Sequence, residues 1–138
     1  MDPKETLEIL EETLDELDNA SRIMPIIVEG LKDRMALRSL NVNGHIVILN
    51  DGDSIIGTCD RIAREWGGAI ILTDWDHKGG QLARQLMDAL NACGIGYDTE
   101  YRATISRLVK KDVKDVEGLP PLIRRLRTMT SSGHAPLF

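Results

Sequence analysis

Residues 69–80 constrain the fold of this chain more than any other stretch. Ala69–Thr73 is apolar and largely β-branched or aliphatic, which is typical of a short strand buried on both faces. Asp74 and Asp76 follow directly, and leucines then recur at helical spacing, which predicts a helix over about Gly80 to Ala92. Two carboxylates therefore lie between a buried strand and a helix. In a parallel α/β sheet this edge binds ligands, and its carboxylates suit Mg²⁺.

Two earlier apolar runs end in the same way. Residues 23–28 read as a buried strand followed at once by Glu29. Residues 45–49 read as a second strand, and the loop after it carries Asp51 and Asp53. Three strand ends are therefore expected to deliver acidic side chains to one edge of the sheet.

Alternation of strands and helices predicts an α/β fold with a mostly parallel central sheet of about four strands flanked by helices. The fourth strand, near Tyr97–Tyr101, has the weakest pattern. We expect three parts: an acidic amphipathic helix in residues 1–21 packed on the domain, an α/β domain over 22–130, and a loose tail over 131–138.

Composition limits the setting. A length of 138 residues suits one domain, and with 4% aromatic residues the core must be aliphatic. Cys59 and Cys93 lack zinc-ligand spacing, and no run is long enough to span a membrane, so a reduced, cytoplasmic protein without a membrane partner is expected.

Charge is distributed unevenly. Residues 1–20 hold eight acidic residues against Lys4, whereas residues 102–127 hold eight basic residues and three acidic ones. Such a basic region is compatible either with a nucleic-acid partner or with an ordinary solvated helix surface.

Carboxylates that converge on one edge cannot all stay ionised cheaply unless a cation is bound. Mg²⁺ held by one or two carboxylates usually keeps waters and takes phosphate oxygens as further ligands. The pattern therefore favours phosphate chemistry.

Two motifs carry a family resemblance. Pro25-Ile26-Ile27-Val28-Glu29-Gly30-Leu31-Lys32-Asp33, followed by Ile71-Leu72-Thr73-Asp74-Trp75-Asp76-His77-Lys78-Gly79-Gly80, resembles the Toprim domain. That Rossmann-like domain occurs in bacterial-type primases, topoisomerases, OLD-type nucleases, recombination mediators and the ribonuclease that matures 5S ribosomal RNA. The similarity is greatest to small stand-alone archaeal Toprim proteins and to the Toprim half of that ribonuclease.

The resemblance implies a site. Glu29 would be the general acid or base, and Asp74 and Asp76 would bind Mg²⁺, with Mn²⁺ as a substitute. Asp33 is expected to be a surface helix residue. Further candidates have no firm motif match. Candidate supporting residues of the site are Asp51, Asp53 and Lys78. Candidate nucleic-acid contacts are Arg102, Arg107, Lys110 and Lys111.

Two functions remain open at this point. The first is a Mg²⁺-dependent nuclease or other phosphotransfer enzyme acting on RNA or DNA. The second is a non-catalytic Toprim module that binds nucleic acid or protein in repair, replication or RNA processing, with a protein partner or a second copy completing it. A receiver domain would need an acidic pair after the first strand, and a dehalogenase-type phosphatase would need its Asp-x-Asp there; the chain offers neither.

Overall fold

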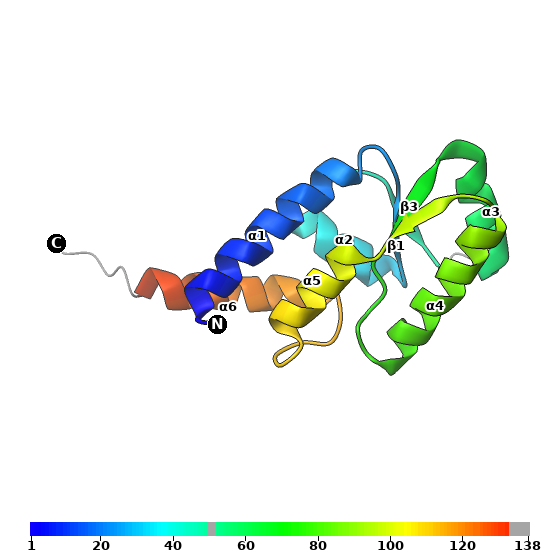
Figure 1. Cartoon of the computed structure of the whole chain (residues 1–138). Helices are drawn as coiled ribbons and strands as arrows, with labels where there is room; N and C mark the ends of the chain where they lie inside the picture. Colours follow the sequence, from blue (N-terminus) through cyan, green and yellow to red (C-terminus); the bar gives the residue numbers. More distant parts are fainter. Residues whose placement is uncertain (50–51, 133–138) are drawn as a thin grey trace.

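The computed structural model describes residues 1–49 and 52–132, which form a three-layer α/β/α domain (Figure 1). All strand pairs in the described sheet are parallel, in the order β2-β1-β3-β4. The strands are β1 (Ile26–Val28), β2 (Ile46–Ile48), β3 (Gly68–Ile71) and β4 (Gly96–Asp98). The helices are α1 (Pro3–Ala20), α2 (Leu31–Ser39), α3 (Ile55–Glu65), α4 (His77–Ala92), α5 (Glu100–Val109) and α6 (Leu119–Ser132). The predicted fold class is confirmed.

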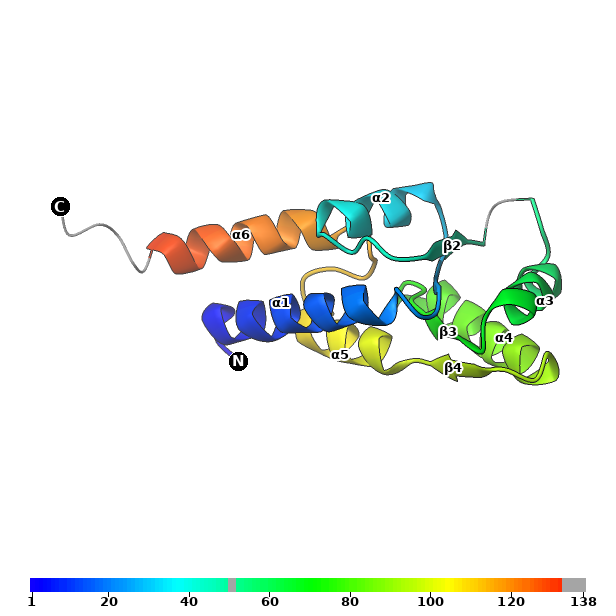
Figure 2. The same cartoon turned by 90° about the horizontal axis from the view of Figure 1, so that it is seen from above.

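The strands bury both faces, so their alternate side chains enter two separate cores. Ile26, Val28 and Ile70 pack with α1, α2, α5 and α6, whereas Ile27 and Ile71 pack with α3 and α4. Figures 1 and 2 show the same division, with α1, α2, α5 and α6 on one side of the sheet and α3 and α4 on the other. None of the helices in the described ranges has both the length and the apolar content needed to cross a bilayer.

Several predicted boundaries were wrong by a few residues. β1 begins at Ile26 rather than Ile23, whose side chain is 71% exposed, since Pro25 precedes the paired residues. Tyr101 lies in α5 instead of the fourth strand. Helix α6 continues through Ser132, and the rest of the predicted tail, residues 133–138, lies outside the described residues.

Helix α1 is stabilised by a cap at its N-terminus and by the burial of its apolar stripe. Its first turn is capped by Asp2, whose carboxylate accepts a hydrogen bond from the backbone N–H of Glu5 at 2.9 Å. Leu10 and Leu17 are fully buried, and the helix packs against α5 and α6. This arrangement lets α1 cover one face of the sheet.

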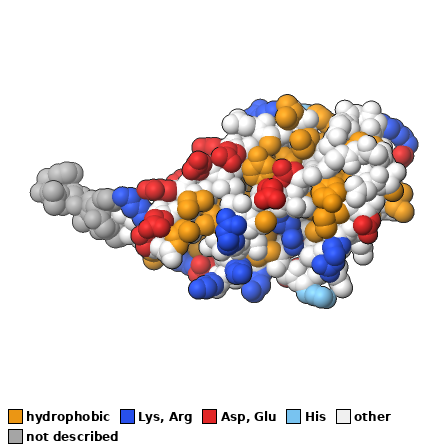
Figure 3. Space-filling model, viewed as in Figure 1, with side chains coloured by type: hydrophobic (Ala, Val, Ile, Leu, Met, Phe, Trp, Pro, Cys, Tyr) orange, Lys and Arg blue, Asp and Glu red, His pale blue; other side chains and the backbone are white. Residues whose placement is uncertain are grey.

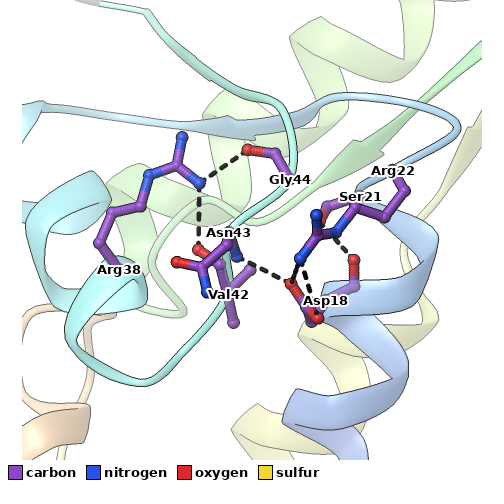
Figure 4. Close-up of polar contacts among 7 residues, drawn as sticks. All are labelled: Asp18, Ser21, Arg22, Arg38, Val42, Asn43 and Gly44. Atoms are coloured by element: carbon purple, nitrogen blue, oxygen red, sulfur yellow. Dashed lines mark hydrogen bonds and ion pairs between the residues drawn. The ribbon is translucent and has the colours of Figure 1, made fainter.

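The C-terminal end of α1 is tied to the loop that leads into β2 (Figure 4). The Asp18 carboxylate accepts a hydrogen bond from the backbone N–H of Asn43 at 2.8 Å. That N–H, and secondarily Arg22, lower the pKa of Asp18. Arg38 donates to the carbonyl of Gly44 at 2.7 Å, so the loop is held from α2 as well. These bonds set where the chain enters β2.

Gly44→Ala should destabilise the protein. A Cβ at Gly44 would overlap the backbone carbonyl of Ser21, which cannot move without disturbing the end of α1. We expect a loss of about 1–3 kcal/mol in the free energy of unfolding, read as a lower Tm in a thermal melt. Gly67→Ala is the matched control, because a Cβ there meets no atom within 4 Å. Equal melting of the two variants would contradict this account of the loop.

Candidate functional site

Glu29 and Asp74 meet at the carboxyl ends of two adjacent strands. β1 and β3 are neighbours in the sheet, although β2 lies between them in sequence, so their junction is a topological switch point. The Glu29 carboxylate accepts a hydrogen bond from the backbone N–H of Asp74 at 2.8 Å. The two motifs singled out in the sequence therefore form one site.

The Asp74 carboxylate lies in an electrostatically unfavourable position. Burial, together with the charges of Glu29, Asp33 and Asp115, raises its pKa to about 7, against an opposing hydrogen bond from the Val116 N–H. That N–H lies 3.0 Å from Oδ1 of Asp74. A carboxyl group with its pKa near neutrality readily exchanges its proton for a cation.

In the turn between β3 and α4, two side chains form hydrogen bonds with the backbone of Gly79. Asp76 is the N-cap of α4, and its Oδ1 accepts the Gly79 N–H at 2.7 Å. The buried Thr73 hydroxyl donates to the Gly79 carbonyl at 2.7 Å. Helix α4 therefore begins at His77, three residues earlier than predicted, and a Cβ on Gly79 would overlap the Asp74 carbonyl.

Arg102 holds the same turn from α5. Its Nε donates to the carbonyl of Thr73 at 2.9 Å and its Nη2 to the carbonyl of Asp74 at 2.7 Å. Burial lowers the pKa of Arg102, while Asp74, Glu29 and Asp76 favour its charged form. The nucleic-acid contact predicted for Arg102 stays a prediction; in the structure this guanidinium lies against the backbone of the carboxylate turn.

A third attachment comes from the α5–α6 connection, residues 110–118. The backbone N–H of Trp75 donates to the carbonyl of Lys114 at 3.0 Å, and its indole N–H donates to the carbonyl of Val113 at 2.8 Å. The ring packs against the core formed with α1 and α6, as expected for an anchoring residue. Trp75 thus fixes the connection beside Asp74.

Three acidic residues that were not predicted as site residues lie close enough to raise the pKa of a carboxyl group there; they are Asp33, Asp115 and Glu117. Asp33 was expected on the surface, but it is 7% exposed and its carboxylate accepts the Gly30 N–H at 3.0 Å. Burial raises the pKa of Asp33, and so do the charges of Glu29, Glu117 and Asp115. The available signal was the position of Asp33 three residues after Gly30, where an acidic side chain can accept the N–H of the residue that caps the helix.

Other predicted residues lie elsewhere. The Asp53 carboxylate faces Arg61 at 3.4 Å, and Asp51 lies outside the described residues. Lys78 is exposed in the first turn of α4. The remaining predicted contacts line a groove with α1 and α6 instead of the carboxylate edge; they are Arg107, Lys110 and Lys111.

The donor chemistry fits a hard cation, but the ligand set is incomplete. Within residues 1–49 and 52–132, no three His, Cys, Asp or Glu side chains stand close enough to form a ready-made metal site. Asp74 and Asp76 each use one oxygen for a backbone N–H. A carboxylate has further lone pairs, so both can still ligate a metal that also keeps water molecules.

Comparison with known proteins identifies the class. The Toprim domain family matches residues 25–108, which contain β1 to β4 and both acidic motifs. The chain therefore belongs to the Toprim domain family, a class of metal-binding, nucleic-acid-related modules. Helices α1 and α6 lie outside the matched region.

Two similar proteins come from archaea. A UPF0292 protein of Methanosarcina barkeri is 34% identical over 92% of this chain and 89% of its own length. A UPF0292 protein of Pyrococcus horikoshii is 40% identical over 73% of this chain and 75% of its own length. A solved structure of a protein from Aquifex aeolicus superposes with a TM-score of 0.69 at 26% identity, covering 78% of this chain and 95% of that one.

Gly79→Ala should distort the Asp74 turn, because its Cβ would meet the Asp74 carbonyl. We expect a lower Tm and loss of any stabilisation by Mg²⁺, measured by thermal melts with and without the cation. Gly80→Ala is the neighbouring control: its Cβ meets only Arg102 Nη2, at 4.0 Å, and Ala favours a helix by about 1 kcal/mol. A Gly79→Ala protein that melts and responds to Mg²⁺ like Gly80→Ala would refute the predicted clash.

Asp74 should make stability depend on pH in EDTA. Because folding raises its pKa from 3.8 to about 7, its acid form stabilises the fold at low pH, and this contribution is lost as the pH rises through about 7. Asp74→Asn is always neutral, so it should raise Tm relative to the parent at about pH 8 and not at about pH 4. Mg²⁺ should then stabilise the parent at the higher pH but not the variant.

The control for this experiment is Asp60→Asn, which removes an exposed carboxylate whose one ion pair among the described residues is with Arg64 on α3. It should follow the parent at every pH and in Mg²⁺. An Asp74→Asn protein that gains as much from Mg²⁺ as the parent would show that the cation binds elsewhere.

Proposed function

We propose that this chain is a Mg²⁺-dependent enzyme that cleaves phosphodiester bonds in RNA or DNA. The observation that carries the proposal is the half-buried Asp74, held beside Glu29 at the switch point of a parallel sheet, with a pKa raised to about 7. Toprim membership supports the same chemistry.

The proposed roles follow from the contacts. Asp74 and Asp76 would hold the cation, which when bound would stabilise negative charge on the phosphoryl oxygens. Glu29 accepts the Asp74 N–H through Oε2 and retains lone pairs with which to move a proton to or from an attacking or leaving oxygen. Arg102 keeps the turn in place through two carbonyl oxygens.

A second candidate is a non-catalytic Toprim module that binds nucleic acid or a protein. One observation favours it: the Asp76 carboxylate already caps α4, and the described residues contain no ready-made set of three metal ligands. Binding without turnover would then be the function.

The test is an end-labelled panel of single-stranded, duplex and structured RNA and DNA, incubated with the protein in Mg²⁺, Mn²⁺ or EDTA. We expect cleavage that requires the cation and falls by about 10²-fold or more in Glu29→Gln, since general acid–base catalysis contributes about 10²–10⁴-fold.

Asp60→Asn again serves as the control and should cleave like the parent, because its carboxylate is exposed on α3. Cleavage that persists unchanged in Glu29→Gln would remove Glu29 from the mechanism. Retarded bands without cleavage in either cation would favour the binding module.

A further inference from the structure

A groove of about 460 Å³ lies between the start of α1, the end of α5 and α6, apart from the carboxylate site. Leu108 and Leu122 contribute to its apolar lining. Four basic side chains line it: Arg107, Lys110, Lys111 and Arg125. Among the described residues, only Arg125 of these four forms an ion pair, with Asp112 at 3.4 Å.

The basic residues continue beyond the groove toward the carboxylate site. Figure 3 shows Lys and Arg side chains gathered over α5 and the connection after it, and further along the same edge toward α4. Arg102 lies farther toward the N-terminus of α5, where it bonds the Asp74 turn. Arg84 on α4 is near enough to Arg102 to repel its charge. Such a row suits an extended polyanion better than a compact anion.

The α5–α6 connection joins the groove to the site. It begins with Lys110 and Lys111, which line the groove. A few residues later, the backbone carbonyl of Lys114 accepts a hydrogen bond from the backbone N–H of Trp75 at 3.0 Å. The backbone N–H of Val116 donates to Asp74 Oδ1 at 3.0 Å. Restraining the start of this short segment therefore restrains the N–H that contacts Asp74.

We propose that the groove is a second nucleic-acid subsite, and that its occupation by strand phosphates increases the affinity of the Asp74 site for a divalent cation through the α5–α6 connection. The inference rests on the proposed function, because it takes the ligand to be nucleic acid. The Val116 N–H donates to Asp74 Oδ1 at 3.0 Å and so fixes the position of the carboxylate that would hold the cation. A strand that immobilises Lys110 and Lys111 keeps this N–H in position.

The proposed coupling should be seen in the binding of both the cation and the strand. Coupling between two sites is reciprocal, so a cation bound at Asp74 should also tighten strand binding by the same factor. Typical couplings of this kind are about 5–150-fold. An acidic peptide could also match the basic lining, but the row of cations that extends past the groove to Arg102 and Arg84 favours a longer chain of phosphates.

The experiment is a calorimetric titration of the whole chain with Mn²⁺, with and without a short phosphorothioate oligonucleotide, as RNA and as DNA, that resists cleavage. We expect the oligonucleotide to tighten Mn²⁺ binding by at least about 5-fold in the parent. In a Lys110→Glu, Lys111→Glu double variant this gain should vanish, while Mn²⁺ binding without oligonucleotide and Tm stay at the parental values.

A matched control reverses two other exposed cations, Arg61→Glu and Arg64→Glu, on α3 across the sheet. It should keep the full gain. The inference is overturned if the oligonucleotide leaves Mn²⁺ affinity unchanged, or if the Lys110 and Lys111 variant keeps the gain. Equal tightening by a poly-glutamate peptide would assign the groove to acidic protein instead.

The two proposals fail in different ways. Cation-dependent cleavage without coupling would refute only the role of the groove. Tight, coupled binding without cleavage would refute the nuclease and leave the groove as the anchor of a binding module. Absence of any Mn²⁺ binding would contradict both.

Discussion

Asp74 is the residue at which the sheet, α5 and the α5–α6 connection are joined. Its N–H is bound by Glu29, its carbonyl by Arg102 and its carboxylate by the Val116 N–H, at 2.7–3.0 Å. A half-buried carboxylate surrounded by other acids is electrostatically unfavourable, and these hydrogen bonds keep Asp74 in that position. The parallel β1–β3 pair supplies the first contact, and the packing of α5 and α6 over that face supplies the other two.

The sequence was most informative where one local rule decides the outcome. Continuous apolar strands predicted a parallel sheet covered on both faces, and the alternation of Ile26, Ile27 and Val28 between two cores is its direct result. The order of the acidic motifs placed Glu29 and Asp74 at one edge before any contact was known. The start of α4 was less certain, because Asp76 caps the helix and His77 begins it before the leucine pattern starts.

Long-range contacts were not accessible in the same way. The side chain of Arg102 reaches carbonyls 28 and 29 residues earlier in the chain, and no sequence spacing encodes that approach. Asp33 looks like a helix surface residue by composition, yet it is buried because α2 starts directly at the site and turns this face inward. Asp53 follows the second strand as expected, but its carboxylate is paired with Arg61 of α3 at 3.4 Å.

The negative charge of the carboxylate site also explains why a polyanion would need a second binding site on this molecule. Arg102 brings one positive charge to an edge that holds Glu29, Asp74 and Asp76, with Asp33 and Asp115 close enough to raise the pKa of Asp74. Without a cation such an edge repels phosphate. Phosphates that first settle on Arg107, Lys110 and Lys111 avoid that repulsion, and the connection beyond these lysines leads straight to the Val116 N–H. Under our proposal, binding of the cation and binding of the strand would be linked through the same connection that contacts Asp74.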